Sequence, residues 1–135
     1  MESGQGPLRV MRILSAIVLF VIGGIHLFLV FDGVGGALGA SFILNAIAGI
    51  ALGIGMLTLR GRFLILDAVL GLLFIIASLI ALLLALTVGL FGIHEVWTFT
   101  LVPETVIVEA IGIVVLGVTS AIALRVREVR VAREA

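Results

Sequence analysis

Four long apolar stretches dominate the chain and are separated by short segments rich in glycine or charge. The stretches cover residues 13–31, 37–59, 63–90 and 103–124, and each is close to or above the roughly 20 helical residues that cross a hydrocarbon core. The glycine-rich segment 32–36 predicts a turn, and the link 60–62 is short enough to force an antiparallel hairpin. The connection 91–102 ends before Pro103, a residue typical of a first helical turn. The pattern predicts an all-α membrane protein, an antiparallel bundle of four transmembrane helices.

Composition supports this interpretation and excludes several classes of function. Hydrophobic residues make up 63% of the chain and charged residues 12%, whereas soluble domains carry roughly 25% charged residues. We therefore expect a single integral membrane domain over residues 1–135, with the lipid bilayer as its main surroundings. The formal net charge is zero and no nucleic-acid-binding patch is present, so we expect no nucleic acid partner. The absence of cysteine excludes a disulfide framework, a thiolate metal site and a dithiol redox relay.

The positive charges predict an orientation in the membrane. All eight are arginines, and they lie in the N-terminal tail, the middle link and the C-terminal tail: Arg9, Arg12, Arg60, Arg62, Arg125, Arg127, Arg130 and Arg133. Segments with positive charge stay in the cytoplasm, so we expect a multi-pass plasma membrane protein with both termini cytoplasmic. The uneven distribution argues against the dual-topology small multidrug transporters, which need balanced charge. The tail 125–135 is expected to extend the last helix, where it lies against anionic headgroups, engages a cytoplasmic partner or forms a solvated flank.

Three polar residues in different predicted helices share one depth. At about 1.5 Å per residue, His26 lies roughly 8 Å, Asn45 roughly 12 Å and Glu109 roughly 9 Å from the outer helix ends. Asp32, His94, Glu95 and Glu104 lie above them at the outer rim. Polar groups inside a bilayer are costly, so this set is a candidate site for a cation, a proton or a polar ligand. We take His26, Asn45, Glu109, Asp32, His94 and Glu95 as its candidate ligand-binding residues.

Each of these residues also has a structural interpretation. The row Ser41, Asn45, Gly49, Gly53 has the four-residue spacing of small side chains that lets a neighbouring helix approach closely, with the amide as an interhelical contact. His26 is then satisfied by a backbone carbonyl or by Glu109. Glu109 is the hardest to explain structurally, because a carboxyl in an otherwise apolar helix must be neutral or paired.

Two further polar sets are expected at the ends of the predicted helices. His94 and Glu95 are typical of an exposed loop pair. Asp67 lies one turn inside its helix, beside the arginines of the middle link, and we expect it to pair with Arg60 or Arg62. Both sets then belong to the membrane interface rather than to a buried site.

A metal site is a weaker possibility. His26, His94 and Glu109 with Asp32 or Glu95 offer nitrogen and oxygen ligands suited to zinc, copper or iron, but the chain has no HExxH motif. Two histidines are also enough for one b-type haem, although His94 falls in a predicted loop. We therefore predict no cofactor and keep metal or haem as an alternative.

The segments His26-Leu27-Phe28-Leu29 and Leu44-Asn45-Ala46-Ile47-Ala48-Gly49 resemble the first hairpin of small four-helix membrane proteins common in actinobacteria. The resemblance covers mainly the first two predicted helices. It implies a bacterial plasma membrane protein with a four-helix fold, and it implies no known activity.

Three functions are compatible with these observations. The first is an accessory, assembly or scaffold subunit acting through helix packing on other membrane subunits or a second copy, because the small-residue row is an interaction surface. The second is a small carrier or binding protein for a proton, ion or small solute entering from the outer face, with His26 and Glu109 as the working pair. The third is a metal or haem redox subunit. The soluble segments are too short for a catalytic domain, which argues against an enzyme.

Overall fold

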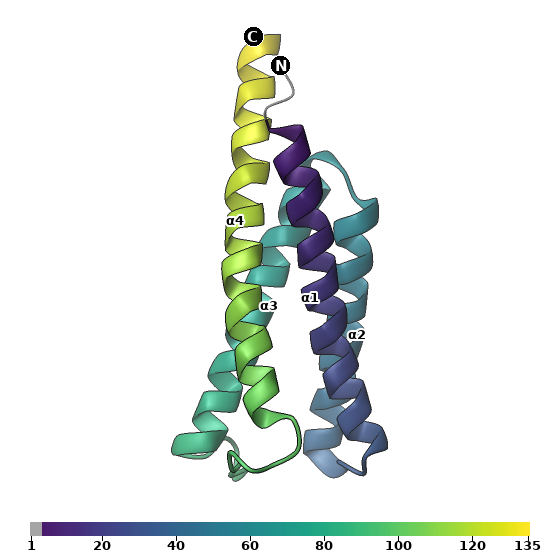
Figure 1. Ribbon diagram of the computed structural model, residues 1–135, viewed down its shortest axis with the longest axis vertical. Helices are drawn as coiled ribbons and strands as arrows, with labels where there is room; N and C mark the ends of the chain where they lie inside the picture. Colours follow the sequence, from purple (N-terminus) through teal and green to yellow (C-terminus); the bar gives the residue numbers. More distant parts are fainter. Residues whose placement is uncertain (1–3) are drawn as a thin grey trace.

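The computed structural model describes residues 4–135 and consists of four helices in which consecutive members run in opposite directions (Figure 1). They are α1 Gln5–Phe31, α2 Gly36–Thr58, α3 Gly61–Thr87 and α4 Val102–Glu134. The predicted all-α four-helix bundle is thus confirmed. Each helix is long and apolar enough to cross a membrane, as expected of a multi-pass membrane protein.

The helices extend past the predicted spans at one end of the bundle. α1 begins at Gln5 and α4 continues to Glu134, so α4 projects beyond its neighbours, and the predicted helical tail is confirmed (Figure 1). We call this end, which carries the start of α1, the end of α4 and the α2–α3 link, the arginine end. The opposite end carries the α1–α2 turn and the α3–α4 connection, and we call it the turn end. α3 stops there at Thr87, earlier than the predicted residue 90.

Glycines make the two tight reversals possible. Gly33 and Gly36 in the α1–α2 turn have φ angles of 105° and 63°, and Gly61 at the start of α3 has a φ of 57°. These left-handed conformations are readily adopted only by glycine, because a Cβ atom would clash with the backbone. Each reversal is therefore encoded locally, as the glycine pattern predicts.

The small-residue row of α2 packs partly against α1. A Cβ atom on Gly49 would lie 2.9 Å from the carbonyl oxygen of Leu19 and 3.1 Å from the Cα atom of Gly23. Gly53 is covered by a side chain of α1, the ring of Phe20, which occupies the space that a Cβ atom would need. Small residues therefore bring the α1 and α2 backbones together, and this part of the row faces the chain's own α1.

Arg12 and Asp67 tie the arginine end together differently from the expected ion pair. Arg12 donates from Nε to the carbonyl of Met56 at 2.7 Å and from Nη2 to that of Leu59 at 2.9 Å, which caps the end of α2. The Asp67 carboxylate lies buried against Gly55 of α2, and its Oδ2 has no hydrogen-bond partner within residues 4–135.

The expected pairing of Asp67 with Arg60 or Arg62 is therefore wrong. Asp67 lies almost two turns inside α3 on the face that contacts α2, whereas both arginines are exposed at the helix end. The guanidinium of Arg62 lies over the ring of Phe63, 4.8 Å from its centroid. Although Asp67 and the two arginines are close in sequence, their side chains lie on different faces of the bundle.

α2 and α3 are close at the arginine end and separate toward the turn end. Their link and the Asp67–Gly55 contact hold them together at one end, whereas α3 finishes across the bundle from the start of α2 (Figure 1). The space between α2 and α3 at the turn end contains the candidate functional site.

Candidate functional site

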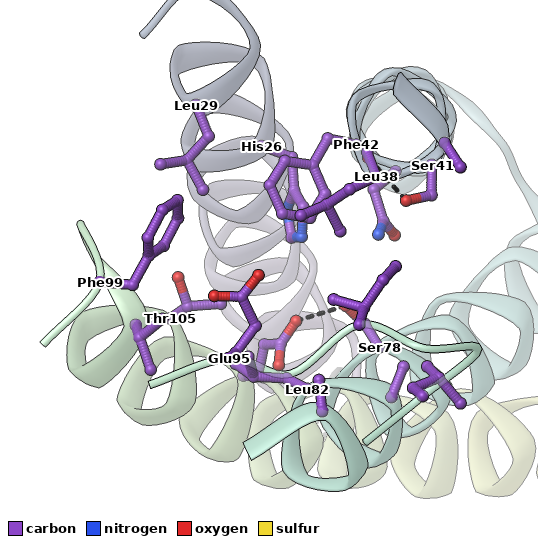
Figure 2. A pocket seen from close by; sticks show the side chains of 18 of the residues that line it. His26, Leu29, Leu38, Ser41, Phe42, Ser78, Leu82, Glu95, Phe99 and Thr105 are labelled. Carbon is purple, nitrogen blue, oxygen red and sulfur yellow. Dashed lines mark hydrogen bonds between the residues drawn. The ribbon is translucent and has the colours of Figure 1, made fainter. Parts of the chain in front are cut away.

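A cavity of about 490 Å³ lies at the turn end and is lined by residues from all four helices and from the α3–α4 connection. Its walls are mainly leucine, alanine and phenylalanine side chains (Figure 2). Its helical polar residues are His26, Ser41, Asn45, Ser78, Thr105 and Glu109. The three residues placed at one depth by the sequence, on α1, α2 and α4, therefore line one common cavity.

Glu109 is the most enclosed polar group of the cavity. Its side chain is 0% exposed, and its Oε1 atom accepts a hydrogen bond of 2.5 Å from the hydroxyl of Ser78 on α3, drawn as the dashed line at Ser78 in Figure 2. The second oxygen, Oε2, is buried without a hydrogen-bond partner among the described residues. With one oxygen unpartnered, this carboxyl is only half satisfied. All eight arginines lie toward the arginine end and none lines the cavity, so within the described part of the chain no arginine lies beside Glu109.

His26 contributes one hydrogen-bond acceptor to the cavity. The side chain is 5% exposed, and Nδ1 lies 2.9 Å from the carbonyl oxygen of Ile22. A carbonyl can only accept, so Nδ1 carries the proton and Nε2 of the neutral ring is an acceptor. The ring of Phe42 packs edge-to-face on His26 at a centroid distance of 5.0 Å, which fixes the orientation of the imidazole (Figure 2).

The predicted row on α2 faces two different neighbours. Ser41 and Asn45 line the cavity, whereas Gly49 and Gly53 pack on α1. A helix has about 3.6 residues per turn, so residues spaced four apart do not lie in a straight line along its axis. The two halves of such a row therefore meet different neighbours. The Ser41 hydroxyl donates to the Leu38 carbonyl at 2.7 Å, and the Asn45 amide makes no hydrogen bond to another described residue.

The α3–α4 connection forms the mouth of the cavity. The backbone N–H of Glu95 donates to the carbonyl of Ala85 at 2.9 Å, which holds the connection over the end of α3. The side chains of Glu95 and Phe99 line the cavity (Figure 2). Glu95, one of the rim residues suggested by the sequence, is therefore part of the cavity.

Asp32 and His94 do not belong to it. Asp32 is exposed at the end of α1, and His94 is exposed with its ring against Gly89. Neighbouring residues in a connection point in different directions, so His94 and Glu95 are separated although they adjoin in sequence. Within residues 4–135 no group of three or more His, Asp or Glu side chains lies close enough to hold a metal ion, so the suggested metal set is not assembled. Because only His26 of the two histidines lines the cavity, the cavity does not hold the histidine pair that a haem needs either.

Ser78 and Thr105 are cavity residues that the sequence interpretation missed. Ser78 is the only polar residue between positions 68 and 86 of α3, and that isolation was a signal in itself. The Thr105 hydroxyl donates to the Leu101 carbonyl at 2.6 Å, a local bond that occupies its proton. A second missed pair, Ser15 and Thr119, joins α1 to α4 by a buried hydrogen bond of 2.8 Å and lies away from the cavity.

Comparisons with known proteins add no further assignment. No family model, no curated protein and no solved structure matches this chain. The chemistry of the site is therefore inferred from its own geometry.

Proposed function

We propose that this chain is a multi-pass membrane protein that binds a small amphiphilic molecule in the outer half of the bilayer. The observation that carries the proposal is the cavity in which His26, Asn45 and Glu109 meet. A concave, mainly apolar space with a few polar groups at one depth is typical of a small-molecule site. The alternative of a carrier or binding protein is thereby favoured over the scaffold.

The scaffold hypothesis depends on a free small-residue face of α2, and the glycine half of that face is covered by α1. Gly49 and Gly53 contact α1, and Ser41 and Asn45 line the cavity. The outer surface of the bundle instead carries large exposed apolar side chains on every helix, which suit the acyl chains of lipids. Placement in a bacterial plasma membrane is part of the proposal and depends on the sequence resemblance.

The outer position of the cavity depends on orientation, which reporter fusions test. The arginine end carries all eight cations and is assigned to the cytoplasm by the positive-inside rule. Reporters fused after Gly61 and at the C-terminus are expected to give cytoplasmic signals, and one inserted near Gly92 an external signal. A cytoplasmic signal at Gly92 would place the cavity in the inner half and overturn the orientation.

Ligand binding is tested by filling the cavity. The probe is 1-adamantanol, a compact apolar body with one hydroxyl, measured by calorimetry on the protein in lipid nanodiscs with empty nanodiscs as the blank. Ala81 of α3 lines the cavity, so Ala81→Trp places an indole in it. We expect saturable binding to the wild type that weakens at least about tenfold in Ala81→Trp, because the occupied volume is lost.

Ile80→Trp is the matched control. Ile80 is the preceding residue on α3, is 52% exposed and does not line the cavity. The same substitution there adds the same indole toward lipid, so adamantanol binding is expected to stay at the wild-type level. Binding that survives in Ala81→Trp, or no binding above the blank, contradicts the proposed function.

A further inference from the structure

We infer that the ligand is an organic cation, a protonated amine on an apolar body, with Glu109 as its counter-ion. The inference rests on the proposed binding function and specifies the chemical class of the ligand. It stands on the hydrogen-bonding inventory of the cavity, on the distribution of charge in the chain and on the composition of the cavity walls.

The three hydroxyl groups that the helices contribute to the cavity already donate their protons within the chain. Ser78 donates to Glu109, Ser41 donates to the Leu38 carbonyl, and Thr105 donates to the Leu101 carbonyl. A hydroxyl has one proton and two lone pairs, so these side chains present only lone pairs to a ligand. The helical hydroxyls therefore act as acceptors.

The two titratable groups from the helices also act as acceptors. Nδ1 of His26 is engaged with the Ile22 carbonyl, which leaves Nε2 of the neutral ring as a lone pair. Oε2 of Glu109 is buried and unpartnered, and an ionised carboxylate only accepts. Asn45 alone offers both a carbonyl oxygen and an NH₂ group. An acceptor-rich cavity complements a ligand head with several N–H donors, and an ammonium group has three.

The charges near the cavity have one sign. Glu109 lies inside, Glu95 lies at the mouth, and no arginine lines the cavity. A buried carboxylate without a partner is strongly unfavourable in the low dielectric of a membrane, and the attraction to a bound cation offsets part of that cost. Phe42 and Phe99 also line the cavity, and their ring faces attract cations.

The walls favour an organic cation over a metal ion. Inorganic cations need several oxygen or nitrogen ligands around one point, and within the described part of the chain no group of three acidic or histidine side chains provides this. Leu29, Leu38, Leu82 and Ala85 form apolar surface around the polar groups. Such surface stabilises a hydrocarbon body attached to the charged head.

The experiment compares two probes that share one body. 1-Adamantylamine is protonated near neutral pH and 1-adamantanol is neutral. A difference between their affinities therefore reports the contribution of the charged head group. Binding is measured by calorimetry in nanodiscs of zwitterionic lipid, with empty nanodiscs as the blank. We expect the wild type to bind the amine at least about tenfold more tightly than the alcohol, since a charge-assisted hydrogen bond is the stronger one.

Two carboxyl variants separate the effect of Glu109 from a general change in charge. Glu109→Gln keeps the shape and removes the charge, so the amine-to-alcohol preference is expected to fall to about one. Glu104→Gln removes an exposed carboxylate in the first turn of the same helix, outside the cavity, and is expected to keep the full preference. Alcohol binding to Glu109→Gln shows that the cavity of this variant is intact.

Each result has a definite consequence. Equal affinity of the wild type for the two probes, with both lost in Ala81→Trp, overturns the cationic ligand and leaves the proposed binding function standing. A preference that persists in Glu109→Gln overturns Glu109 as the counter-ion. Absence of binding by both probes, or binding unaffected by Ala81→Trp, overturns the inference together with the proposed function.

Discussion

Gly49→Leu is expected to destabilise the folded bundle by about 3 kcal/mol, at the upper end of the usual range for overpacking. Even the first side-chain carbon would lie 2.9 Å from the Leu19 carbonyl oxygen and 3.1 Å from the Cα atom of Gly23. These are backbone atoms, so α1 and α2 must separate before a side chain fits. Thermal unfolding in mild detergent, followed by circular dichroism, measures the loss, and Gly49→Ala is expected to give a smaller effect of the same sign.

Gly24 provides the matched control for this prediction. It lies in the middle of α1, and no heavy atom outside its own helical backbone lies within 4 Å of a Cβ atom built there. Gly24→Ala is expected to stabilise the protein by about 0.5–1 kcal/mol, because alanine is the better helix former. Gly49→Leu and Gly24→Leu with equal melting temperatures would show that the α1–α2 contact does not limit stability.

Ser78→Ala is expected to destabilise the protein, whereas Glu109→Leu is expected to leave it as stable as the wild type or more stable. Ser78 donates the one hydrogen bond that Glu109 receives from residues 4–135, so its removal leaves both carboxyl oxygens without a partner among them. The penalty for such a group is about 1–3 kcal/mol. Leucine at position 109 removes the unsatisfied carboxyl and fills similar space, an exchange that is often neutral or stabilising.

The double variant Ser78→Ala with Glu109→Leu completes the measurement. Without the carboxyl, loss of the hydroxyl has little effect, so the double variant is expected to unfold near Glu109→Leu and above Ser78→Ala. Melting temperatures of the four proteins in one detergent give the coupling between the two positions. A Glu109→Leu variant that unfolds far below the wild type would show that the carboxyl is needed for folding, which contradicts a carboxyl retained for a ligand.

The expected pattern separates stability from binding at one residue. Glu109→Leu removes the counter-ion of the proposed ligand, so binding is expected to weaken. It also removes a buried oxygen that has no hydrogen-bond partner among the described residues, so the folded protein is not expected to lose stability. Residues kept at a cost in stability are typical of functional sites. The same variants therefore serve both the unfolding and the binding measurements.

Much of the fold and part of the site could be predicted from the sequence. The apolar stretches are close to bilayer length, and a helix is the element that satisfies its own backbone in lipid, so the four helices follow from composition along the chain. The constant rise of a helix then converts sequence position into depth. For that reason the sequence alone predicts that His26, Asn45 and Glu109 belong to one layer.

Depth does not determine which way a residue faces, and the errors arose there. The sequence places Asp67 close to Arg60 and Arg62 along the chain, yet its carboxylate packs against Gly55 on α2. His94 and Glu95 share the rim, and only Glu95 lines the cavity. In a helix that is apolar all round, hydrophobicity does not identify the buried face, because lipid and protein interior are equally apolar.

The sequence by itself determined four helices, their approximate ends, the concentration of arginine at one end and the depth of the polar layer. Only the tertiary structure decided that α1 covers Gly49 and Gly53, that Ser78 meets Glu109, and that α2 and α3 leave a cavity at the turn end. The first set depends on interactions that are local along the chain or with the solvent. The second depends on how far each helix is rotated about its axis, and that rotation is set by close packing between surfaces distant in sequence.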